Sequence, residues 1–321
     1  MKRVVSLLIV LLALNSCDDG DLIQEDISFE DTATLSCTTN NIIFKLKDKE
    51  SLLLEIPESS FVNEPTPEGE PTIIAINSTN RVVYRFYSGT VSQNNICETI
   101  PPASPAVTDQ WTATDGEIQI TTTAVKTTNT TTGRTTITGY NHNIVFKNIT
   151  FDKGDGTSFV KETFPFGDYV TTATTLPFGF DEVVEQCSTS KQIYNYTSSE
   201  ALTLDDIDPD LIKNEITPLD TPRTGLIGTT TNKLVYRLYS NGVLTPSYFC
   251  NTTTPTLPTK SEEWIANAGV ANVSGIIEVT TTSVLGTFIH KIVLKKVILT
   301  SGNSNFTLGD SYIYGELITT N

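Results

Sequence analysis

The sequence predicts an all-β protein made of two tandem homologous antiparallel domains, each a β-sandwich or a small β-barrel with one internal disulfide. Three observations predict this fold. Short runs of β-branched and aromatic residues alternate with polar ones, the chain matches itself at an offset of about 150 residues, and cysteines recur with that match. A sandwich and a small barrel produce the same alternation, so the sequence leaves both open.

The internal repeat depends on rare residues that recur in the same order. The matched positions are 80–88 with 232–240, Cys37 with Cys187, Cys97 with Cys250, Trp111 with Trp264, His142 with His290, and 164–168 with 306–310. The chain has two tryptophans and two histidines, and each pair falls on one repeated position. We therefore expect two copies of one topology.

The first 16 residues are typical of a secretory signal peptide. Lys2 and Arg3 precede an apolar run over residues 4–14, which is too short to span a bilayer as a permanent helix. The next residues, Leu14-Asn15-Ser16-Cys17, resemble a lipobox, the tetrapeptide whose cysteine is acylated and becomes the new N-terminus. The resemblance implies a lipid on Cys17; the alternative is an ordinary signal peptide with a stray cysteine.

Acidic residues follow the lipobox at positions 18, 19 and 21. This arrangement resembles the export signal of Bacteroidota-type surface lipoproteins. The resemblance implies a protein anchored by lipid in the outer membrane and exposed at the cell surface, with a periplasm-facing location as the alternative.

With Cys17 assigned to the lipid, four cysteines remain, and four cysteines allow three connectivities. A domain that is copied whole should contain its own bridge, and export favours oxidation. We therefore predict the disulfides Cys37–Cys97 and Cys187–Cys250. Each closes a loop of about 60 residues, which stabilises the fold by roughly 4 kcal/mol through chain entropy.

Strand and turn patterns predict individual elements. Residues 43–47 and 52–56 flank a short turn and predict a hairpin, as do residues 73–77 and 81–87. The expected meander consists of residues 117–125, 135–140 and 143–151.

The first copy should also have a longer hairpin tip around residues 127–133. Thr122 and His142 are 20 positions apart, whereas the matching Thr281 and His290 are nine apart.

These patterns divide the chain into five parts. They are a signal peptide (1–16), an acidic tether (17–35), the first β-domain (36–172), a linker (173–182) and the second β-domain (183–321). The net charge is −16, and it becomes −18 when the two positive charges of residues 1–16 are removed. Such a charge repels nucleic acid and anionic headgroups, so we expect membrane contact through the lipid alone.

The candidate site residues favour binding over catalysis. Trp111 and Trp264 could stack on a sugar ring as in carbohydrate-binding modules, or anchor the edge of a core. His142 and His290 have no second histidine or free thiol in their own copy, which argues against a zinc site or a nucleophile–base pair. We expect no metal, cofactor or catalytic residue.

Two further motifs concern the surface. Asp31-Thr32-Ala33 resembles the O-glycosylation motif of Bacteroidota-type exported proteins, with Thr32 as the acceptor. Acidic runs at residues 152–156 and 205–210 lack the spacing of a calcium loop and are expected to stabilise turns.

Two hypotheses for function follow. The first is a cell-envelope lipoprotein that acts as a non-enzymatic structural or adhesive surface module. The second is a surface glycan-binding lipoprotein, similar in layout to those of polysaccharide-utilisation systems. A glycoside hydrolase is a third and weaker alternative, since it needs only two carboxylates that the fold brings together.

Overall fold

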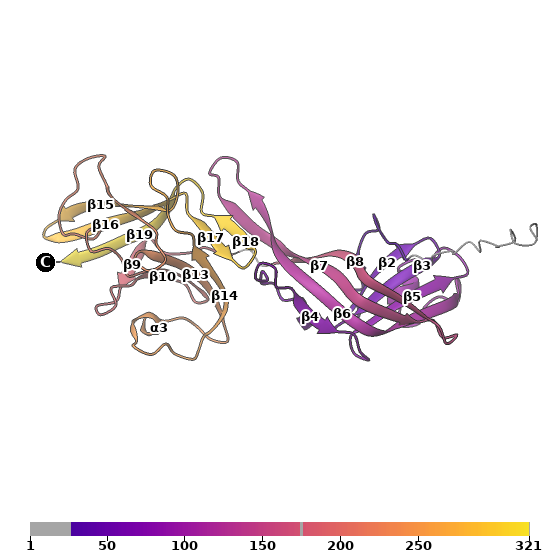
Figure 1. The fold of residues 1–321 in the computed structure, drawn as a ribbon. Coiled ribbons are helices and arrows are strands. Elements are labelled where there is room, and N and C mark those ends of the chain that lie inside the picture. Colours follow the sequence, from indigo (N-terminus) through magenta and orange to yellow (C-terminus); the bar gives the residue numbers. More distant parts are fainter. Residues whose placement is uncertain (1–26, 174–175, 321) are drawn as a thin grey trace, which may run out of the picture.

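The computed structural model describes residues 27–173 and 176–320, which form two curled, mainly antiparallel sheets that lie end to end (Figure 1). Each sheet is a half-barrel around its own core, and each contains one of the predicted disulfides. The all-β fold is therefore confirmed. Within the described residues no helix is long and apolar enough to cross a membrane.

The first sheet has the order β1-β2-β3-β5-β6-β7-β8, with β4 paired to β6. Its strands are β1 (Leu35–Ser36), β2 (Ile42–Lys47), β3 (Glu50–Glu55), β4 (Thr72–Ala75), β5 (Arg81–Tyr87), β6 (Val107–Thr128), β7 (Thr135–Asp152) and β8 (Ser158–Thr172). Short helices η1 (Glu58–Ser60) and α2 (Asn94–Cys97) lie in its connections.

The second sheet has the order β12-β15-β16-β19-β9-β10-β11-β13-β14-β17-β18. Its strands are β9 (Val183–Gln186), β10 (Ile193–Tyr196), β11 (Glu200–Asp205), β12 (Arg223–Leu226), β13 (Lys233–Ser240), β14 (Thr259–Ala266), β15 (Ile276–Val284), β16 (Thr287–Lys295), β17 (Ile298–Ser301), β18 (Ser304–Thr307) and β19 (Tyr312–Thr320). The short helix α3 (Ser247–Cys250) precedes β14.

The two copies share a topology but divide it into strands differently. β6 pairs with β5 through its first part and with β4 through residues 117–120, so one bent strand serves both halves of the sheet. In the second copy these two parts are separate strands, β14 and β15. β9 then joins the two halves of the second sheet, parallel to β19 and antiparallel to β10.

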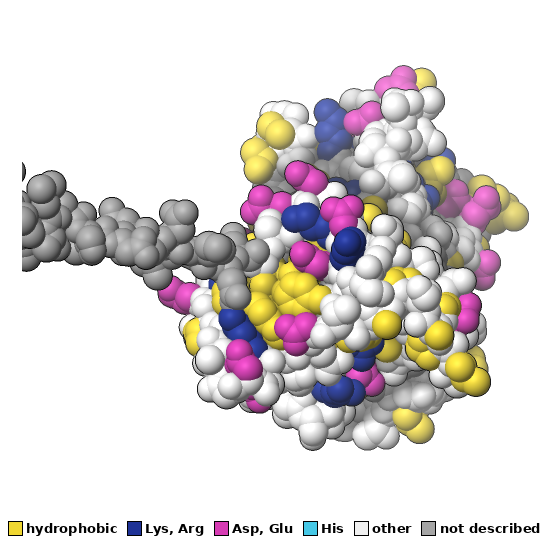
Figure 2. All heavy atoms as spheres, turned by 90° about the vertical axis from the view of Figure 1, so that its right-hand side faces the viewer, with side chains coloured by type: hydrophobic (Ala, Val, Ile, Leu, Met, Phe, Trp, Pro, Cys, Tyr) yellow, Lys and Arg dark blue, Asp and Glu magenta, His cyan; other side chains and the backbone are white. Residues whose placement is uncertain are grey.

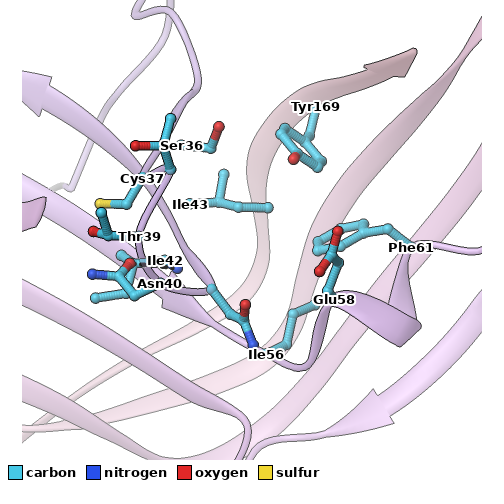
Figure 3. A pocket seen from close by; sticks show the side chains of 12 residues that line it. Ser36, Cys37, Thr39, Asn40, Ile42, Ile43, Ile56, Glu58, Phe61 and Tyr169 are labelled. Atoms are coloured by element: carbon cyan, nitrogen blue, oxygen red, sulfur yellow. Dashed lines mark hydrogen bonds between the residues drawn. The ribbon is translucent and has the colours of Figure 1, made fainter.

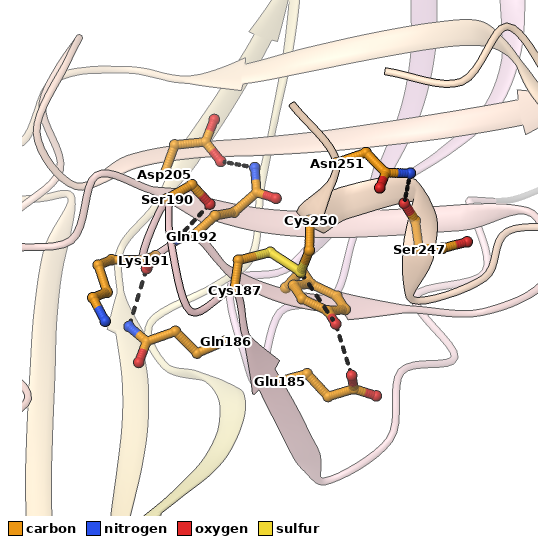
Figure 4. Close-up of a disulfide and its surroundings, with 11 residues drawn as sticks. Glu185, Gln186, Cys187, Ser190, Lys191, Gln192, Asp205, Ser247, Cys250 and Asn251 are labelled. Carbon is orange, nitrogen blue, oxygen red and sulfur yellow. Dashed lines mark hydrogen bonds between the residues drawn. A yellow bond between two sulfur atoms is a disulfide. The ribbon is translucent and has the colours of Figure 1, made fainter. Parts of the chain in front are cut away.

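The two disulfides hold equivalent places. Cys37–Cys97 and Cys187–Cys250 have Cα–Cα distances of 5.3 and 5.2 Å and sequence separations of 60 and 63 residues. Each ties the turn before the first long strand to a short helix, α2 or α3 (Figure 4 shows the second). The predicted pairing is confirmed.

One predicted hairpin is correct and one is wrong. β2 and β3 pair around the two-residue turn Asp48-Lys49. Residues 77–80 also turn, but β4 and β5 do not pair with each other, since both pair with β6. The alternation pattern could not reveal this, because it does not encode the partner of a strand.

The sequence match near the end of the two copies is also wrong. Gly167 pairs with Ile144 and Gly315 pairs with Ile292, so residues 164–167 correspond to 312–315 instead of 306–309. Phe306 instead takes the place of Phe159, and each of these rings packs beside the tryptophan of its own copy.

The first copy begins before residue 36. Ile27 and Phe29 are buried in its core, and the Lys45 ammonium donates to the Phe29 carbonyl oxygen at 3.3 Å. Residues 27–29, predicted to belong to the tether, are thus part of the domain.

The predicted long hairpin tip joins the copies. The β6–β7 hairpin extends beyond the first sheet and lies beside β18 of the second (Figure 1). Its Thr132 carbonyl accepts from the Asp310 N–H at 3.0 Å, and the Thr135 hydroxyl accepts from the Thr307 N–H at 2.7 Å. Lys126 Nζ donates to the Asn305 carbonyl at 2.7 Å.

Apolar contacts complete this joint. Ile137 and Tyr140 of β7 belong to the same buried cluster as Trp264, Phe306 and Leu308 of the second copy. The core of the second copy therefore continues into the first, and the eleven inserted residues supply much of the contact.

Candidate functional site

Two predicted modification sites fall near the N-terminus. Cys17 lies outside the described residues. Thr32 is half-buried in a turn, where its N–H donates to the Phe29 carbonyl at 3.2 Å and its hydroxyl donates to the Glu30 carbonyl at 3.4 Å.

Both tryptophans are buried. Trp111 is 6% exposed and Trp264 is 0% exposed, and their indole N–H groups donate to Asp109 at 3.0 Å and to Glu262 at 2.6 Å. Trp111 packs edge-on against Tyr84 and Phe86. A ring packed in this way has no free face for a sugar, so the tryptophans serve as core anchors. Stacking of a sugar on Trp111 or Trp264 would require exposed rings, and neither ring is exposed.

The two histidines occupy the same buried network. In the first copy, Nδ1 and Nε2 of His142 lie 2.9 and 3.1 Å from the hydroxyls of Thr122 and Thr171. Because the Thr171 hydroxyl donates to Asn63 at 2.6 Å, Nε2–H must donate to Thr171 and Nδ1 must accept from Thr122. Burial lowers the pKa of His142 to about 4, which keeps the ring neutral.

The second copy repeats the network residue for residue. The corresponding side chains are Thr281, His290, Thr319 and Asn214. Burial lowers the pKa of His290, and the positive charge of the nearby Arg223 lowers it further. Both histidines lie inside their strands, β7 and β16, and with both ring nitrogens engaged they link these strands to the neighbouring strand on each side.

The acidic runs stabilise turns, as predicted. Asp152 accepts from the Gly154 N–H at 2.8 Å, and Asp155 accepts from the N–H and hydroxyl of Thr157. In the other run, Asp208 accepts from the Asp210 N–H at 2.9 Å. Among residues 27–173 and 176–320, no three His, Cys, Asp or Glu side chains are grouped to hold a metal ion.

A cavity of about 460 Å³ lies at the edge of the first copy, between the residues around Cys37 and the helix η1 (Figure 3). Ile43 and Ile56 form its buried base. Phe61 and Tyr169 form an aromatic wall, with their rings edge to face at a centroid distance of 5.0 Å. We call this cavity the Phe61 pocket.

The polar groups of the Phe61 pocket come from two segments. Asn40 extends from the turn after Cys37, and Glu58 extends from η1 on the side of Phe61 (Figure 3). Asn41, which follows Asn40, also lines the cavity. Within the described part of the chain, the side chains of Asn41, Glu58 and Tyr169 make no hydrogen bond or ion pair. They remain free to contact a ligand.

Two other cavities have polar groups that are mostly engaged with other side chains; Glu64, in the wall of the first, makes no hydrogen bond or ion pair among the described residues. A cleft between the copies contains Glu262, which accepts from Tyr140 and Trp264, and Glu263, which pairs with Arg237 at 2.6 Å. The second cavity lies beside α3 and contains the same Arg237–Glu263 pair. These groups stabilise the protein itself.

Sequence reasoning did not single out Phe61 or Tyr169. The signal that could have found them is a difference between the two copies. Phe61 corresponds to Ile212, two positions before Asn214. Tyr169 corresponds to Leu317, because Leu317 pairs with His290 as Tyr169 pairs with His142. Comparison of the chain with protein-family models, curated proteins and solved structures finds no match to any of them.

Proposed function

We propose that the chain is a lipid-anchored lipoprotein of the cell envelope, displayed at the outer membrane, that acts as a non-enzymatic structural or adhesive module. The observation that carries this proposal is the joint between the copies. A flexible linker would leave two independent domains, whereas the β6–β7 hairpin continues one core into the next. Such a joint holds the second copy in a fixed position relative to the first, which would follow a lipid on Cys17 in the chain.

The buried histidines support a non-enzymatic role. A general base must reach the proton that it abstracts, and both imidazoles are fully buried with each ring nitrogen engaged. A glycoside hydrolase would need two available carboxylates across a cleft. In the cleft between the copies, Glu262 and Glu263 are held by other side chains, and Glu64 is the single lining carboxylate without such a partner among the described residues.

The experiment compares three forms of the chain in a bacterium that acylates lipoproteins. Palmitate should label the wild type and not Cys17→Ala, and protease added to intact cells should digest the labelled protein. In the third form, Leu-Gly replaces residues 126–138, which gives the first copy the shorter hairpin of the second.

Small-angle scattering of the purified chains measures the joint. The shortened form should be labelled and exported normally but show a broader distribution of molecular length, whereas Thr130→Ala, at an exposed tip position, should match the wild type. Palmitate labelling that persists in Cys17→Ala would refute the anchor, and a wild type as variable in length as the shortened form would refute the rigid display role.

A further inference from the structure

We infer that the Phe61 pocket binds a neutral saccharide unit. This inference goes beyond the display role and does not depend on it. It moves ligand binding away from the two tryptophans, to a cavity whose aromatic rings lie 108 positions apart in the chain.

The size and shape of the pocket suit a small ring. Its volume of about 460 Å³ lies within the range of roughly 300–1,000 Å³ that is typical of small-ligand sites. Phe61 and Tyr169 are both half-buried, so part of each ring faces the cavity. The C–H faces of a pyranose pack well against aromatic rings, while its hydroxyl groups need polar partners nearby.

The pocket offers those polar partners in the right kinds. The Asn41 amide can donate and accept, the Glu58 carboxylate can accept two hydroxyl groups, and the Tyr169 hydroxyl can do either. Because these groups make no bonds within the described part of the chain, a ligand would not have to displace existing partners.

The charge of the pocket favours a neutral sugar. Among the described residues that line it, none is basic and Glu58 is the single acid. Anionic sugars and phosphates need Arg, Lys or a cluster of N–H donors to offset their charge, and the Glu58 carboxylate would repel them.

The second copy is an internal control for this argument. Ile212 and Leu317 take the places of Phe61 and Tyr169 on the same scaffold, and both pack against the core. Aliphatic residues therefore satisfy the packing at these two positions. The aromatic pair of the first copy is best explained by a ligand.

The test uses the full chain in detergent micelles and saturation-transfer difference NMR, which detects weak binding. The probes are cellobiose, maltose, lactose, mannobiose and chitobiose at about 10 mM, with galacturonic acid as the anionic comparison. At least one neutral probe should bind. Its affinity should fall at least tenfold in Phe61→Ile and Tyr169→Leu, the residues that the second copy carries.

Tyr248→Leu, within α3 of the second copy, is the matched control and should bind like the wild type. Circular dichroism should show that all variants remain folded. Three results would overturn the inference: no neutral probe binds the wild type, Tyr169→Leu binds as well as the wild type while folded, or galacturonic acid binds more tightly than every neutral probe.

Discussion

The hydroxyl of Tyr140 in the first copy donates a 2.7 Å hydrogen bond to the carboxylate of Glu262 in the second copy. The same carboxylate oxygen accepts from the indole N–H of Trp264 at 2.6 Å. Burial raises the pKa of Glu262, although these two hydrogen bonds oppose the shift. In the first copy, Trp111 donates instead to Asp109, which is exposed. The Glu262 carboxylate thus has two roles: it accepts the hydrogen bond of Trp264 within the second copy and that of Tyr140 across the joint.

Tyr140→Phe should destabilise the joint. It removes one donor from a buried carboxylate and leaves the ring in place, so we expect a loss of about 1–3 kcal/mol in the free energy of unfolding. Urea denaturation measures the loss. Tyr169→Phe removes a hydroxyl that makes no hydrogen bond within the described part of the chain, so its effect should be near zero. Equal effects of the two changes would contradict the role of Glu262.

A glycine in the β17–β18 turn tests the joint from the other side. A Cβ added at Gly302 would clash with the Thr66 carbonyl oxygen of the first copy, and φ at Gly302 is +50°. Gly286, in the β15–β16 turn, has a φ of +81° and nothing within 4 Å of an added Cβ. Gly286→Ala therefore measures backbone strain alone, about 1 kcal/mol.

We expect Gly302→Ala to cost more than Gly286→Ala and to broaden the distribution of molecular lengths in solution scattering. The extra cost comes from the contact with Thr66, because both positions carry backbone strain. Similar losses for the two variants, with an unchanged length distribution, would show that the copies do not meet at Gly302.

The fold was predictable where it depends on composition and repetition. Alternation identified most strand residues, although it divided β7 into two strands, 135–140 and 143–151. The duplicated cysteines gave the connectivity of both disulfides. The extra residues between Thr122 and His142 also predicted the long hairpin correctly. What this hairpin contacts was not predictable, because an intramolecular interface leaves no pattern as regular as a strand's alternation.

Pairing between distant strands and the ligand pocket were not predictable. The turn at residues 77–80 has the sequence of a hairpin, but β4 and β5, the strands on either side of this turn, both pair with β6. Phe61 and Tyr169 meet only because β8 pairs beside His142, whose ring lies 5.3 Å from that of Phe61. The distribution of charge on the surface was not predictable either. At the free end of the first copy, charged side chains of both signs surround a central group of hydrophobic side chains (Figure 2), and the net charge of the chain does not reveal this arrangement.

The disulfides should contribute equally to the two copies. The paired cysteines are 60 and 63 positions apart in the sequence, so the two closed loops are of similar length. Chain entropy therefore predicts a loss of roughly 4 kcal/mol for each bridge removed. The test replaces both cysteines of one bridge with alanine, in the first copy or in the second, and follows guanidinium denaturation. A much smaller loss in one copy would show that its bridge closes a loop that is already ordered in the unfolded chain.

Acid should destabilise the first copy through His142. The folded protein holds this ring neutral, with a pKa of about 4, whereas the unfolded chain binds a proton below about pH 6.5. The stabilising contribution is therefore complete above pH 6.5 and is lost as the pH falls toward 4. Lowering the pKa of His142 from about 6.5 to about 4 corresponds to roughly 3 kcal/mol once both states are protonated.

His142→Gln tests this contribution, because an amide can bond Thr122 or Thr171 and does not titrate. The variant should be less stable than the wild type at pH 7, but its unfolding free energy should fall less between pH 6.5 and 4. His290→Gln, with His142 retained, should show a similar flattening, since burial lowers the pKa of that ring as well. Carboxylates titrate in all three proteins, so only the difference between the curves reports on the histidines. Parallel curves for the wild type and both variants would mean that the imidazoles accept protons without opening the Thr-His-Thr networks.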